Sequence, residues 1–230
     1  MVAVLPEPPL LVAELAGAAA AETVELRAAC RAAAARLAET AATWVAVGAD
    51  AGGRRTVTPD TRGTFAGFGA DVVVGLDPDS SAAVDPDLPL PLLIAGWAAA
   101  GLRVRIRGEL VDPDLPTAEC LELGARLGSE PVGLLVVGDG AATHTAKAPG
   151  HLDERAGPFD DTVSRALRDA DPAALAALDP AVAAQLWAVG RAPWQVLAGA
   201  TGGRAWTGEL LYSAAPFGVG YHVALWTPVR

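Results

Sequence analysis

The loop that follows a predicted buried strand at residues 132–137 carries the side chains best suited to chemistry. It contains His144 behind two glycines, which let the backbone leave the strand tightly. A histidine held on such a loop can transfer protons near neutral pH or bind a metal ion. We predict His144 as a general acid/base, with a tight turn bearing a surface histidine as the alternative. The pocket residues expected around it are Gly138, Asp139, Gly140, Thr143, Lys147 and His151.

This loop lacks two common phosphate-binding patterns. Lys147 is followed by Ala148, where a P-loop needs serine or threonine. Thr143 occupies the position of the third glycine in a dinucleotide-binding fingerprint. Neither motif therefore accounts for the two glycines of this loop.

The alternation of strands and helices predicts the scaffold that positions the loop. Strands are predicted at 2–5, 44–48, 71–76, 103–107, 132–137, 209–212 and 219–226. Helices are predicted at 17–40, 90–101, 117–127, 159–170, 172–178, 180–189 and 193–200. This order is typical of a three-layer α/β/α fold, with a mainly parallel or mixed central sheet covered by helices on both faces. Residues 1–230 are expected to form one such domain.

Ligands of open α/β sheets bind outside the carboxyl ends of the strands. Four segments leave strands in that direction, and any active site should be assembled from them. They are Pro6–Pro9, the loop from Ala49, the loop from Gly138 and the turn between the last two strands.

Charge and hydropathy exclude several classes of protein. Lys and Arg number 17 against 27 Asp and Glu, and the net charge of −10 argues against nucleic-acid and anionic-membrane partners. The longest apolar run, 88–102, falls short of the ~20 residues that span a bilayer. Cys30 and Cys120 lie outside any metal-ligand spacing, which favours structural thiols. We expect a cytoplasmic protein that binds a small molecule, without nucleic-acid or membrane partners.

Two further features allow both structural and functional interpretations. His222 alternates along the last predicted strand, which is typical of a strand-face or core histidine. Arg103, Arg105 and Arg107 form a stripe on another strand. A solvated face explains this stripe, although an edge strand there could also pair across a homo-oligomer interface.

Three segments together resemble the class III, LigB-type extradiol ring-cleavage dioxygenases, which include a Memo-like branch. The opening strand and its Pro6–Pro9 turn resemble the start of these proteins. Residues 137–144 resemble the Gly-x-Gly-Gly-x-Ser-His loop that carries the family's acid/base histidine. Residues 210–221 resemble the closing strands. The chain looks most like the small actinobacterial branch of this dioxygenase superfamily, over essentially its whole length.

The resemblance implies specific roles for some residues. The family holds Fe(II) on two histidines and one carboxylate, and a further histidine handles protons. His144 matches the acid/base position, whereas Glu7 stands at the first ligand position and Asp50 at the second. Glu209 is the candidate for the third ligand. Three carboxylates would suit Mg²⁺, Mn²⁺ or Ca²⁺ better than a redox-active iron.

These assignments lead to an expected function. We expect a LigB-like protein that has lost the two-histidine iron site and binds a small aromatic or anionic metabolite, with His144 as acid/base. No cofactor is expected, and Fe(II) or another divalent cation is the alternative. An active metal-dependent ring-opening dioxygenase with an atypical ligand set and a non-catalytic assembly module are the alternative functions, and the oligomeric state stays open.

Overall fold

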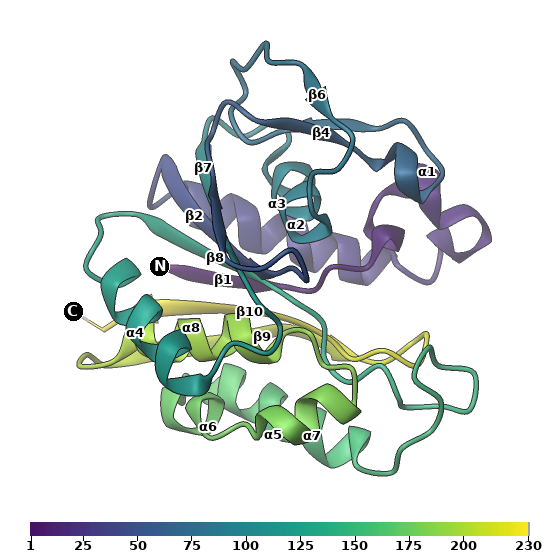
Figure 1. The fold of residues 1–230 in the computed structure, drawn as a ribbon, viewed down its shortest axis with the longest axis vertical. Coiled ribbons are helices and arrows are strands. Elements are labelled where there is room, and N and C mark those ends of the chain that lie inside the picture. Colours follow the sequence, from purple (N-terminus) through teal and green to yellow (C-terminus); the bar gives the residue numbers. More distant parts are fainter. Residues whose placement is uncertain (230) are drawn as a thin grey trace.

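Parallel strands form the centre of the fold. In the computed structural model, which describes residues 1–229, they belong to a seven-stranded sheet of order β3-β7-β2-β8-β1-β10-β9 (Figure 1). Strands β7, β2, β8 and β1 are mutually parallel, and β10 runs antiparallel to β1, β9 to β10 and β3 to β7. The bounds are β1 Val2–Leu5, β2 Thr43–Ala49, β3 Arg55–Val57, β7 Arg105–Val111, β8 Gly133–Val137, β9 Trp206–Ala214 and β10 Tyr221–Pro228.

Helices cover both faces of this sheet. Helices α2 and α3 lie on one side, and α4 to α8 lie on the other (Figure 1). Each face has its own apolar core, so that Ala3 and Leu5 of β1 pack on one side while Val2 and Val4 pack on the other. Strands buried on both faces explain the uninterrupted apolar segments of β1 and β8. The predicted three-layer α/β/α fold class is confirmed.

The helices largely follow the predicted ranges. Helices α6 and α7 begin with Asp-Pro pairs, and the side chains of Asp171 and Asp179 accept backbone N–H groups of the first turns. The predicted helix over 17–40 is shorter, because its first part forms a short 3-10 helix that starts at Gly17, whose φ is +49°. The bounds are α1 Ala13–Ala16, α2 Val24–Ala38, α3 Leu90–Ala99, α4 Thr117–Leu127, α5 Ala156–Asp169, α6 Pro172–Ala176, α7 Pro180–Gln185 and α8 Arg191–Thr201. Short 3-10 helices cover Pro9–Leu11, Gly17–Ala20 and Phe65–Phe68.

Short strands outside the main sheet correct one prediction. The strand predicted at 71–76 is present as β5 (Val73–Gly75), but it pairs with β4 (Arg62–Thr64) rather than with the main sheet. Strand β4 also pairs with β6 (Val84–Asp85). This small sheet packs above α3 in Figure 1.

The strand that carries Arg105 and Arg107 is not the outermost strand of the sheet. Strand β7 lies between β2 and β3, and the N–H of Ile106 donates to the carbonyl of Leu76 at 2.7 Å. Arg105 pairs with Asp77 at 2.7 Å, and Arg107 pairs with Glu130 at 2.9 Å. Arg105 and Arg107 are therefore engaged in ion pairs within the chain.

Helices α4 and α8 approach closely through glycines. A Cβ on Gly124 would collide with the carbonyl oxygen of Val196, and one on Gly128 would collide with that of Ala200. Gly199 of α8 faces Leu121 in the same way. Backbone atoms are in contact here, so a larger side chain has no space that a rotamer change could supply.

Replacing Gly124 with alanine is therefore expected to lower the free energy of unfolding by about 3 kcal/mol, since α4 and α8 must move apart. Urea denaturation measures this change. Gly157→Ala in α5 is the matched control, because its Cβ meets nothing within 4 Å and should raise stability by about 0.5–1 kcal/mol. Equal effects of the two substitutions would contradict the packing argument.

No helix within residues 1–229 is long and apolar enough to cross a membrane.

Candidate functional site

Carboxylates gather where three neighbouring parallel strands end, at the edge of the sheet away from the two termini (Figure 1). Glu7 follows β1, Asp50 follows β2 and Asp139 follows β8. The N–H of Glu7 donates to Oδ1 of Asp139 at 2.7 Å. Glu7 is only 8% exposed, and its Oε2 atom has no hydrogen-bond partner among the described residues.

Burial raises the pKa values of Glu7 and Asp139. Desolvation, followed by the charges of Asp139 and Asp50, raises the pKa of Glu7 well above its usual range. Desolvation also raises the pKa of Asp139 to about 7, although part of its side-chain surface remains accessible. The nearby charge of Asp160 adds to that rise, and the N–H of Glu7 opposes it. At neutral pH the pair therefore carries fewer than two negative charges.

His144 lies in direct contact with a carboxylate of another element. Its Nε2 atom lies 2.6 Å from Oδ2 of Asp160, which belongs to α5. The loop that carries His144 is tied to the turn before β10, because the N–H of Gly140 donates to Gly220 at 2.7 Å and that of His144 to Gly218 at 3.1 Å. These backbone hydrogen bonds fix the loop and hold His144 beside the carboxylate of Asp160.

Asp160 packs closely against two glycines. Its Oδ1 accepts the N–H of Ala141 at 3.2 Å, and its carboxylate would collide with a Cβ on Gly140 or Gly220. His222 of β10 lies on the same carboxylate, with Nε2 3.3 Å from Oδ1. The direction of that contact is unsuitable for a hydrogen bond, so Nε2 of the buried His222 has no hydrogen-bond partner among the described residues.

A pocket of about 340 Å³ opens beside these groups. A carboxylate-paired histidine on its wall can act as a general acid/base toward a bound molecule. The residues of the wall that bear on chemistry are His144, Asp160, Asp161, Ser213, Gly220 and His222.

The other residues predicted around His144 have different positions. A Cβ on Gly138 would collide with Gly190, so this glycine serves close packing of the loop. Thr143 is buried, and its hydroxyl has no hydrogen-bond partner within the described part of the chain. Lys147 and His151 are exposed and lie outside the residues that line the pocket. Of the predicted set, only His144 reaches the pocket with a functional side chain.

Sequence reasoning missed Asp160, Ser213 and the contact of His222. A signal for Asp160 exists, because it occupies the buried stripe of α5 together with Ala156 and Val163. A carboxylate on such a stripe needs a partner, which here is His144. The predicted core position of His222 is correct, but its contact with Asp160 depends on how α5 packs against β10.

The positions that the LigB resemblance assigns to Fe(II) do not fit that metal. Glu7 and Asp50 stand where histidines are needed, and Asp50 instead pairs with Arg55 at 2.6 Å. Glu209 is wrongly placed by the prediction, because it lies out on β9 opposite Leu225, where it pairs with Arg36 at 2.6 Å. Across residues 1–229, no group of three or more His, Cys, Asp or Glu side chains is spaced to hold a metal ion.

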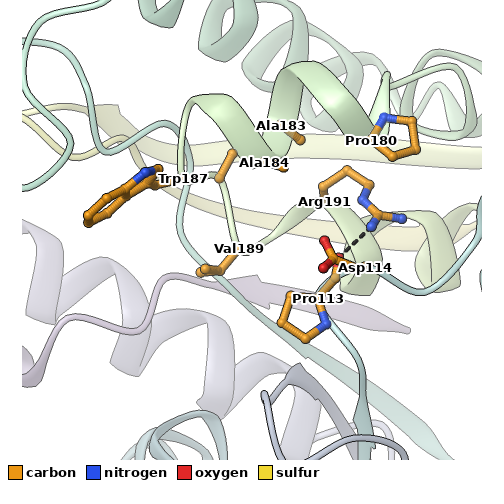
Figure 2. Close-up of a pocket in the computed structure, with 9 residues that line it drawn as sticks. Pro113, Asp114, Pro180, Ala183, Ala184, Trp187, Val189 and Arg191 are labelled. Carbon is orange, nitrogen blue, oxygen red and sulfur yellow. Dashed lines mark hydrogen bonds between the residues drawn. The ribbon is translucent and has the colours of Figure 1, made fainter.

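A second, largely apolar pocket of about 260 Å³ lies between the end of β7 and helices α7 and α8. Figure 2 shows Trp187 at one end of this pocket and Arg191 at the other. Trp187 is 56% exposed and adopts a left-handed backbone conformation, with φ of +56°. The guanidinium of Arg191 donates to the carbonyl of Pro113 (Figure 2) and to that of Leu115 at 2.6 Å. Arg191 thus ties the β7–α4 connection to α8.

Comparisons with known proteins show the fold alone. The chain is similar to the crystal structure of the uncharacterized protein JW3007 from Escherichia coli K12, with a TM-score of 0.58 and 14% sequence identity. The match covers 98% of each chain. No protein-family model and no curated protein matches the sequence.

Proposed function

We propose that this chain is a LigB-like protein that has lost the two-histidine iron site and binds a small hydroxylated aromatic molecule, with His144 as the acid/base. The observation that carries the proposal is the 2.6 Å contact between His144 and Asp160 on the wall of a pocket. Histidine at positions 7 and 50 is missing, while the family-like position of His144 is kept.

The pair has the geometry of an oriented proton carrier. Asp160 engages Nε2 of His144, which leaves Nδ1 to exchange a proton with a bound hydroxyl group. Asp160 fixes the orientation of the ring and stabilises the imidazolium that forms. Ala141 and the two flanking glycines hold Asp160 itself in place. His144 would therefore accept a proton from the ligand without a metal ion.

The charges of the pocket wall favour an aromatic ligand over an anionic one. The pocket wall contains the carboxylates of Asp160 and Asp161, which oppose an anion in a site of about 340 Å³. A neutral aromatic ring with hydroxyl groups avoids this repulsion and supplies hydrogen-bond donors to carboxylate and imidazole acceptors. We therefore favour the aromatic class.

A titration with 4-nitrocatechol tests this proposal, because loss of a phenolic proton changes its visible absorption. The wild-type protein is expected to produce that change on binding, and His144→Ala is expected to abolish it. His151→Ala is the matched control, since His151 is an exposed histidine outside the pocket. An undiminished response of His144→Ala would overturn the assignment.

A further inference from the structure

We propose that Ser213 is a nucleophile in the same pocket, with His222 as its base, and that the pocket accepts small aryl esters. This inference rests on the proposed function, because it assigns His144 the proton transfer to the departing phenol. Three side chains carry it: Ser213 of β9, His222 of β10 and Asp160 of α5.

Ser213 and His222 are direct partners across the last two strands. Their contact joins Oγ of Ser213 and Nδ1 of His222 at 3.0 Å. Ser213 is exposed and lines the pocket, whereas His222 is 2% exposed. The hydroxyl is thus accessible to a ligand while the imidazole behind it is shielded from water.

The far side of His222 faces a carboxylate. When the hydroxyl of Ser213 donates to Nδ1, the neutral ring carries its proton on Nε2. Nε2 lies 3.3 Å from Oδ1 of Asp160 and forms no hydrogen bond in this arrangement. If Nδ1 takes the serine proton, the ring becomes an imidazolium beside the carboxylate, which favours the charged state. A serine, a histidine and an aspartate arranged in this order match the logic of an activated nucleophile.

The reaction balances with water as the only co-reactant. Oγ of Ser213 forms a bond to the ester carbonyl carbon, and its proton passes to Nδ1 of His222. The bond from that carbon to the aryl oxygen breaks, and protonated His144 donates a proton to the departing oxygen. Water then attacks the acyl-serine and gives a proton to His144, while His222 returns its proton to Oγ. The products are a carboxylic acid and a phenol, and all three side chains are restored.

A fluorophosphonate probe tests the nucleophile directly, since it reacts with activated serine hydroxyl groups and releases fluoride. We expect peptide mass spectrometry to find the adduct on Ser213 of the folded wild-type protein. The exposed Ser81 is the internal control and should stay unmodified. Ser213→Ala should remove the adduct, and His222→Gln should slow labelling by about 100-fold or more.

Further outcomes of the labelling experiment separate this proposal from the acid/base proposal and define what would overturn it. Labelling of Ser213 in the wild-type protein is read independently of the 4-nitrocatechol titration, because fluoride departs without a proton from His144, so a failure of the acid/base proposal remains distinguishable. Because a substitution of the buried His222 can prevent folding, the wild-type result decides: no adduct on Ser213, or equal labelling of Ser213 and Ser81, overturns the proposal. Equal labelling of Ser213 in folded and heat-unfolded protein also overturns it.

Discussion

Asp139→Asn is expected to raise the free energy of unfolding at pH 8 and to leave it nearly unchanged at pH 4. Burial holds the pKa of Asp139 at about 7, above its ordinary value of 3.8. Between these values Asp139 binds more protons in the folded state than in the unfolded state, so its contribution to the stability of the wild type falls as pH rises from about 4 to about 7. The difference between the two pKa values corresponds to a change in the free energy of unfolding on the order of 4 kcal/mol.

Asparagine removes this loss because it cannot ionise, and its Oδ1 can still accept the N–H of Glu7. Urea denaturation at several pH values measures the effect. Asp87→Asn is the matched control, because Asp87 is exposed and should give a pH dependence like that of the wild type. If Asp139→Asn keeps the wild-type decline between pH 4 and pH 7, burial of Asp139 is not its cause.

Arg191→Met is expected to lower the free energy of unfolding by about 3 kcal/mol or more. Arg191 is 2% exposed and donates to the carbonyls of Pro113 and Leu115 and to Oε1 of Gln195 at 3.1 Å. Methionine fills similar space but leaves these acceptors without the guanidinium, and an unsatisfied buried acceptor costs about 1–3 kcal/mol. The β7–α4 connection then loses its tie to α8.

Thermal or urea unfolding measures this loss at a single pH. Arg191→Lys should recover part of the stability, because one ammonium group replaces only some of the hydrogen bonds of the planar guanidinium. Arg165→Met on the exposed surface of α5 is the control and should change stability by less than about 0.5 kcal/mol. A similar loss in both methionine variants would contradict the structural role of Arg191.

The hydrophobic pattern of the sequence predicted the buried elements well, because side chains that face the core must be apolar. Residues 2–5 and 117–127 have the predicted bounds, since both carry apolar side chains on the faces that the core covers. The short strand β3 has no such pattern, because its side chains are mostly exposed and only its pairing with β7 defines it. The residues of β3 alone do not indicate this pairing, because it depends on a strand far away in the sequence.

The candidate site was only partly predictable for a related reason. His144 could be found because glycines and a buried strand precede it within one segment. Asp160 and Ser213 come from other elements, and only the packing of α5 and β9 brings them to His144 and His222. The prediction of Glu209 as a metal ligand was wrong for the same reason, because its position on β9 places it beside Arg36 and not with Glu7.

The 4-nitrocatechol titration carried out in excess EDTA tests whether His144 accepts a proton without a metal ion. We expect the proton-loss spectrum to develop fully in the chelator and to be absent from His144→Ala, because the His144–Asp160 pair takes the proton without a metal ion. A response that appears only after Fe(II) is added would contradict this account and restore a metal centre at the strand ends.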